Sequence, residues 1–85
     1  MIKLLGFTKS SNPKKKYDAY LLHNGKIKKV PFGDTAYQQY QDKALGLYKY
    51  LDHLDKDRRI RYKLRHEQDR HIKYSAGWFS DKYLW

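Results

Sequence analysis

The sequence contains no cysteine and no long apolar run. Without cysteine, neither a disulfide framework nor a zinc site built on thiolates is available. Apolar runs such as Leu4-Leu5 are far too short for a helix that spans a membrane. The residues before Gly6 also lack the longer apolar region of a signal peptide. We therefore expect an intracellular protein without a transmembrane segment.

Acidic residues are scarce as well. Nine Asp and Glu face 19 Lys and Arg, which leaves a net charge of +10 on 85 residues. A chain of this length forms one small domain, so the charge stays at the surface and repels itself unless an anionic partner neutralises it. Nucleic acid, an anionic membrane surface and an acidic protein assembly are the candidate partners. Nine tyrosines favour nucleic acid because bases stack on them, although most rings in a small domain belong to its core.

The first third of the chain has the pattern of β-strands. Three short segments are rich in strand-forming residues: 2–7, 17–22 and 26–32. Asn24-Gly25 between the last two is the strongest short signal for a type I′ hairpin turn, and Pro31 favours an edge strand. The sequence therefore predicts a three-stranded antiparallel meander over residues 1–33. Its core face is expected to carry Tyr17, Ala19, Leu21, Val30 and Phe32.

Beyond Gly33 the apolar spacing changes to that of helices. Residues three or four apart form one stripe: Tyr37, Tyr40, Ala44, Leu47, Leu51 and Leu54. This spacing predicts a helix over residues 34–54, and Gly46 leaves open two shorter pieces. Asp55 can cap a basic helix over 55–70, and Ser75 an aromatic helix over 75–85. The predicted fold class is α+β, a single small domain with the meander followed by two to three helices.

Two groups of residues are expected to serve the structure alone. Asn24 and Gly25 form the hairpin turn. Four rings of the last segment are expected to fix the C-terminal helix to the core: Trp78, Phe79, Tyr83 and Trp85.

The excess positive charge lies in two blocks. Residues 1–34 contain eight lysines and two aspartates, a net +6, and residues 55–74 contain eight basic and four acidic side chains, a net +4. The candidate contacts to phosphate or carboxylate groups are Lys14, Lys15, Lys16, Lys28 and Lys29 in the first block and Arg58, Arg59, Arg61 and Arg65 in the second. Lys28 and Lys29 could instead prevent edge-to-edge sheet pairing, and the arginines could be a solvated helix face with local ion pairs.

Residue patterns of catalytic and metal sites are missing. The four histidines do not share a helix face with enough other ligands for a metal site: His23, His53, His66 and His71. The carboxylates are scattered, and there is no glycine-rich phosphate loop or nucleophile motif. We expect no catalytic residues, no metal, no cofactor and no small-molecule substrate.

The second half of the chain contains a recognisable series of motifs. They are Tyr48-x-Tyr50-x-x-His53, then Asp55-Lys56-Asp57-Arg58-Arg59-x-x-Tyr62-x-x-Arg65-His66, then Ala76-Gly77-x-x-Ser80-x-x-Tyr83-Leu84-Trp85. With Phe32-Gly33 before it, the series resembles a family of short, basic proteins of nucleocytoplasmic large DNA viruses, a family without an established catalytic role. The stretch between Gly33 and Tyr48 is longer here than in that family. The resemblance implies a viral protein, intracellular in its host and packaged in the virion.

We therefore expect a non-enzymatic protein that binds an acidic partner. The leading interpretation is nucleic acid, and DNA in particular, bound without sequence preference. The alternative is a minor capsid or virion structural protein whose basic face docks on acidic capsid proteins. Both interpretations require the two cationic blocks to lie on the same side of the molecule.

Overall fold

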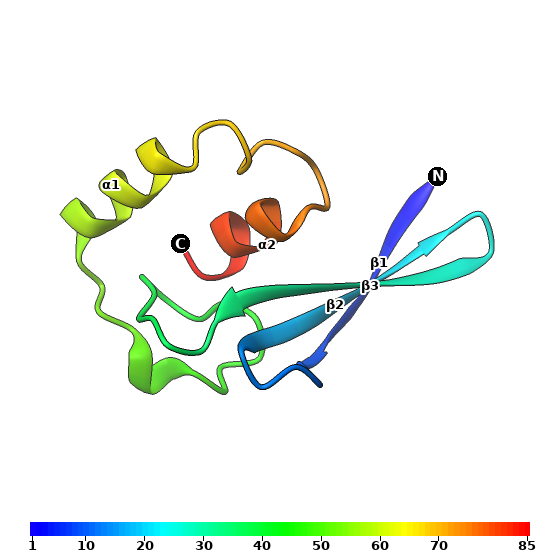
Figure 1. Cartoon of the computed structure of the whole chain (residues 1–85), viewed down its shortest axis with the longest axis horizontal. Helices are drawn as coiled ribbons and strands as arrows, with labels where there is room; N and C mark the ends of the chain where they lie inside the picture. The colour runs from blue at the N-terminus through cyan, green and yellow to red at the C-terminus, as the bar shows by residue number, and fades with distance from the viewer.

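The computed structural model describes all 85 residues and has the predicted α+β architecture (Figure 1). Its elements are the strands β1 (Ile2–Lys9), β2 (Lys15–His23) and β3 (Lys26–Asp34), the 3-10 turn η1 (Lys49–Leu51), and the helices α1 (Lys56–Arg65) and α2 (Ala76–Tyr83). The strands form one antiparallel sheet in the order β1-β2-β3. The three-stranded meander followed by two helices is thus confirmed. None of the helices is both long and apolar enough to cross a membrane.

The β2–β3 hairpin follows the predicted turn and register. Asn24 and Gly25 have φ values of 52° and 76°, as a type I′ turn requires. Leu22 pairs with Ile27 and Tyr20 with Lys29, which leaves the alternate residues on the other face. On that face four side chains are buried as expected, namely Tyr17, Ala19, Leu21 and Phe32, while Val30 is half-buried against them. β3 is an edge strand.

Helix α2 covers the core face of the sheet. The Phe79 ring is fully buried, with its centroid 5.4 Å from that of Phe32 and 6.0 Å from that of Phe7. Tyr83 packs 4.7 Å from Phe7. Ser75 caps the helix as expected, because its side chain accepts a hydrogen bond from the backbone nitrogen of Trp78.

The predicted helix over residues 34–54 is wrong. Only the single turn η1 is helical there, and three members of the apolar stripe are exposed: Tyr37, Leu47 and Leu54. Two polar residues are buried instead, with Gln39 0% and Asp42 4% exposed. A helix would have put these polar groups on its solvated side, so the segment had to take another course to bury them.

A buried hydrogen-bond network gives this segment its shape. Gln39 Nε2 donates to the carbonyl oxygen of Tyr48 at 2.7 Å and to Asp52 Oδ1 at 2.6 Å. The Asp42 carboxylate accepts from the Tyr17 hydroxyl and, at 3.0 Å, from the backbone nitrogen of Tyr48. Buried polar groups require such partners, and here they fix a loop against the sheet.

Helix α1 is shorter than predicted, and its apolar side faces outward. It ends at Arg65, not near residue 70, although Asp55 caps it by accepting from the backbone nitrogens of Asp57 and Arg58. Ile60 and Leu64 are 57% and 69% exposed. The side that faces the protein is polar and aromatic, so α1 is attached by specific contacts rather than by an apolar stripe.

Candidate functional site

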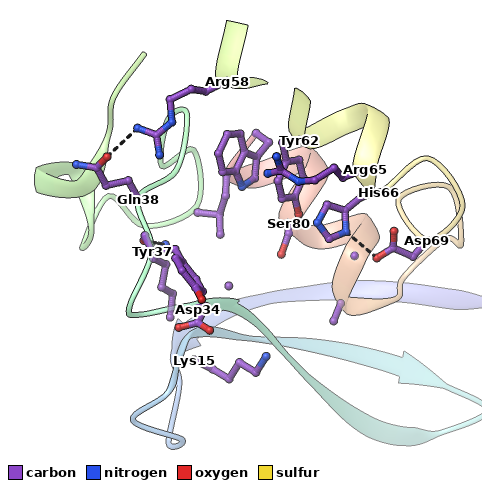
Figure 2. Close-up of a pocket in the computed structure, with 16 residues that line it drawn as sticks. Lys15, Asp34, Tyr37, Gln38, Arg58, Tyr62, Arg65, His66, Asp69 and Ser80 are labelled. Atoms are coloured by element: carbon purple, nitrogen blue, oxygen red, sulfur yellow. Dashed lines mark hydrogen bonds and ion pairs between the residues drawn. The ribbon is translucent and has the colours of Figure 1, made fainter. Parts of the chain in front are cut away.

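A pocket of about 430 Å³ opens between α1, α2, the loop that follows β3 and the end of the sheet where β2 begins. Figure 2 shows the side chains of Arg58, Tyr62 and Arg65 reaching into this region from α1. On the opposite side lie Lys15 and Asp34, which face each other in the β2–β3 register. The pocket therefore joins the start of the lysine-rich hairpin to the arginine-rich helix.

Three surface cations line the pocket without an ionic partner. Lys15, Arg58 and Arg65 have no carboxylate oxygen within 4.0 Å of their charged nitrogens. Arg58 Nη1 donates to Gln38 Oε1 at 2.8 Å, a neutral acceptor that holds the guanidinium without cancelling its charge. These side chains therefore remain available for an anion.

Both carboxylates of the pocket are hydrogen-bonded, Asp69 to another lining side chain and Asp34 to the backbone. Asp69 Oδ2 lies 3.2 Å from Nδ1 of His66. Asp34 Oδ1 accepts a hydrogen bond from the backbone nitrogen of Ala36 at 2.8 Å. With four basic side chains, Lys16 included, and two carboxylates among the lining residues, the formal charge of the pocket is +2 before any contribution from His66.

Lys16 does not lie on the surface as the sequence suggested. It belongs to β2, is only 2% exposed, and donates from Nζ to the carbonyl oxygen of Tyr37 at 2.8 Å. Burial lowers the pKa of Lys16 to about 8, against the opposing effect of the Asp34, Asp42 and Asp52 carboxylates. Lys16 thus forms part of the pocket wall and is not a flexible surface contact.

Stacked rings form a second part of the wall. Tyr62 is parallel to Trp85, with centroids 4.2 Å apart and an interplanar angle of 3°, and its centroid lies 4.3 Å from that of His66. Burial raises the pKa of Tyr62 to about 12, so its hydroxyl stays protonated at neutral pH. Tyr37, on the loop after β3, is different because 68% of it is exposed. Its ring is free to contact a ligand.

Two glycines allow the elements around the pocket to approach closely. A Cβ at Gly33, which has a φ of 78°, would lie 2.8 Å from Leu84 Cδ1. A Cβ at Gly77 would lie 2.7 Å from Asp69 Oδ2. A larger residue at either position would therefore force the neighbouring Leu84 or Asp69 side chain to shift.

The remaining predicted binding residues lie outside the pocket. Lys14 is exposed in the loop at the same end of the sheet, where its carbonyl accepts from the Thr35 nitrogen. Lys28 and Lys29 pair with Leu21 and Tyr20, which places them roughly 15–20 Å further along the sheet toward the hairpin turn. The structure therefore brings only one end of the hairpin to the helix.

The arginines of α1 are divided between structure and surface. Arg59 Nε donates to the carbonyl oxygen of Trp85 at 2.7 Å, and its guanidinium lies 5.0 Å from the centre of the Tyr40 ring. It therefore attaches α1 to the body of the protein. Arg61 is exposed, has no ion pair and does not line the pocket.

Of the 16 lining residues, sequence reasoning named only Lys15, Lys16, Arg58 and Arg65 as binding residues, and it missed the others, among them Asp34, Tyr37, Gln38, Tyr62 and Ser80. Comparisons of the chain with protein-family models, curated proteins and solved structures find no match. Ten of the 16 lining residues, among them Tyr62, Arg65 and Trp85, come from Phe32-Gly33 and the motif segments of the second half of the chain. These motifs are far apart in the sequence but line one pocket in the structure. The motifs were therefore the signal in the sequence that could have identified these lining residues.

The side chains of the pocket fit an anion better than a metal ion. His66 and Asp69 are a pair, and the structure groups no three histidine, cysteine or acidic side chains that could hold a metal. Guanidinium and ammonium groups without carboxylate partners bind phosphate or carboxylate oxygens. The chemistry available at this site is therefore anion binding next to aromatic rings.

Proposed function

We propose that this protein is a non-enzymatic binder of nucleic acid that contacts the phosphate backbone without sequence preference. The observation that supports it most is the pocket at which Lys15, Arg58 and Arg65 gather without carboxylate partners. Phosphate contacts of this kind position a protein on nucleic acid but do not read its sequence. The net charge of +10 adds long-range attraction to any polyanion.

The resemblance to the viral family suggests where this activity would be used. A basic protein packaged in the virion and made inside the host cell would meet the viral genome, and DNA is then the expected polyanion. Its role would be to neutralise and organise the backbone.

A salt series tests the proposal. In a gel-shift assay, affinity for DNA should be measurable at about 50 mM salt, and the logarithm of the binding constant should fall linearly with the logarithm of salt concentration. On duplex DNA the slope is about −0.9 for each phosphate neutralised. No binding of single-stranded or duplex DNA at about 50 mM salt would contradict the proposal.

A matched pair of variants then tests which cations are used. The double variants Arg58→Gln/Arg65→Gln and Lys28→Gln/Lys29→Gln both lower the net charge from +10 to +8. The arginine pair should reduce the salt slope by about one for each phosphate that is no longer neutralised, whereas the lysine pair should change it little. Equal effects would mean that net charge matters and the pocket does not.

One observation favours a second function. Ile60 and Leu64 are exposed on α1, with Arg61 between them in sequence. A phosphate backbone offers such apolar side chains no partner, whereas an acidic protein surface can contact both the apolar and the cationic groups. The protein would then be a minor capsid component that docks on acidic capsid subunits, and it should co-purify with capsid shells after the genome is removed.

A further inference from the structure

The pocket has the dimensions of a small-ligand site and not those of a surface for a double helix. Its volume of about 430 Å³ falls within the range typical of sites that enclose single small molecules. A duplex keeps its bases stacked inside and presents only its outer surface to a protein. A base can enter a pocket of this kind only after it has left the stack, as in a single strand.

The lining side chains also provide more than phosphate contacts. Tyr37 exposes most of its ring at the rim, so one face can receive a base. Gln38 accepts from Arg58 through Oε1, which leaves its amide nitrogen free to donate to a base edge or a sugar oxygen. A surface that only followed a phosphate backbone would need neither group.

Cations and ring lie on different elements that face each other across the opening. Arg58 and Arg65 come from α1, and Lys15 from the start of β2. Tyr37 lies between these elements in the close-up (Figure 2), on the loop whose carbonyl oxygen is held by buried Lys16. The backbone of Tyr37 is therefore held by Lys16 before a ligand binds, which reduces the entropy lost when a base stacks on the Tyr37 ring.

We infer that the pocket binds one nucleotide of a single-stranded nucleic acid, with its phosphate between Lys15 and the arginines of α1 and its base against Tyr37. The inference deepens the proposed function and rests on it. Charge alone would favour duplex DNA, which has the higher density of phosphate. A preference for single strands therefore distinguishes this site from simple charge attraction.

Fluorescence anisotropy with a labelled strand of about 20 nucleotides, alone and annealed to its complement, tests the preference. At roughly 150 mM salt, where weak surface electrostatics is screened, the single strand should bind about tenfold more tightly than the duplex. Deoxyuridine and uridine strands, which differ only at the 2′-position of the sugar, should be compared as well. A stronger interaction with either one identifies the natural sugar, and both results agree with the inference as long as the duplex is weaker.

Three single variants locate the site. Arg65→Ala and Tyr37→Ala should each weaken single-strand binding about tenfold, because each removes a phosphate contact or a stacking face. Arg61→Ala is the matched control, since Arg61 is exposed on the same helix and has no ion pair, but lies outside the pocket. It should weaken binding only about twofold. Circular dichroism checks that all three variants fold, as expected for exposed positions.

Competition separates a nucleotide site from a phosphate site. A deoxynucleoside monophosphate should displace the labelled strand at a concentration about tenfold lower than inorganic phosphate does. The inference is overturned if phosphate competes equally well, if duplex and single strand bind alike, or if the Tyr37 and Arg61 variants cannot be distinguished. Those results would leave nucleic-acid binding intact, whereas the absence of all binding would overturn both proposals.

Discussion

At the scale of single residues, the most informative side chains are polar ones that the fold buries. Asp42 is 4% exposed, yet it accepts hydrogen bonds from the Tyr17 hydroxyl and the Tyr48 nitrogen. Gln39 is fully buried, and its amide nitrogen is bonded in the same region, whereas its Oε1 has no hydrogen-bond partner. Such residues show no special pattern in the sequence, because Asp and Gln are exposed in most proteins. Their burial is decided by the tertiary structure, and the sequence could not predict it.

Lys16 leads to a prediction about the pH dependence of stability. Burial lowers its pKa to about 8 in the folded protein, whereas the unfolded chain has the ordinary value of 10.5. Between these pH values Lys16 is more often protonated in the unfolded state than in the folded state, so the free energy of unfolding should rise with pH in this window. From about pH 7.5 to 9.5 the gain should be about 1–2 kcal/mol.

The variant Lys16→Met supplies the control for this measurement. The methionine side chain has a similar length but does not titrate, so the stability of the variant should not show this rise. Urea unfolding of both proteins at several pH values gives the free energy of unfolding of each. The tyrosines that titrate at higher pH contribute to both proteins, so the difference between the two free energies removes their contribution. Parallel curves for the two proteins would contradict a lowered pKa for Lys16.

At the scale of elements, the sequence predicted those parts whose signal is local. The meander follows from three strand-forming segments and an Asn-Gly turn, and the caps at Asp55 and Ser75 mark where α1 and α2 begin. The helix over 34–54 failed because apolar spacing does not reveal which polar groups will be buried. Apolar spacing also gave no guide to how α1 is attached, because its apolar residues are few and Tyr62, Arg59 and Lys63 make its contacts instead.

The outward position of the apolar side chains of α1 can be tested by mutation. Ile60→Gln and Leu64→Gln should each change the free energy of unfolding by no more than about 0.5 kcal/mol, because both side chains are already largely in water. Tyr62→Ala should lower it by about 2 kcal/mol, because it removes a ring stacked on Trp85. Thermal or urea unfolding of the three variants checks this. A large loss with Ile60→Gln would mean that the apolar side of α1 is buried in solution.

At the scale of the whole molecule, the sequence predicted the charge excess but only part of its arrangement. Lys15 and the arginines of α1 do line one pocket, although Lys15 is more than 40 residues from Arg58 and Arg65 in the sequence. Lys28 and Lys29 belong to the same cationic block but lie toward the other end of the sheet. A block of charge in sequence therefore did not become one surface, because a strand distributes its residues along its length.

The imbalance of charge also predicts how the free protein responds to salt. Lowering the Debye length screens the repulsion among cations, so adding sodium chloride from about 10 mM to about 300 mM should stabilise the folded protein by on the order of 1 kcal/mol. For a domain of this size, that corresponds to a rise in Tm of about 4–8 °C. Sodium sulfate at equal ionic strength should give a larger rise. Sulfate strengthens apolar burial in any protein, but here it should also bind the pocket in the folded state.

The two double variants separate these contributions of sulfate. The Lys28→Gln/Lys29→Gln protein should keep the whole difference between sulfate and chloride, because its pocket is intact. The Arg58→Gln/Arg65→Gln protein has the same net charge but should lose the part that comes from anion binding, so its difference should be smaller. Thermal unfolding in the two salts measures both. An equal difference in the two variants would mean that these arginines do not form an anion site, whatever the net charge of the molecule.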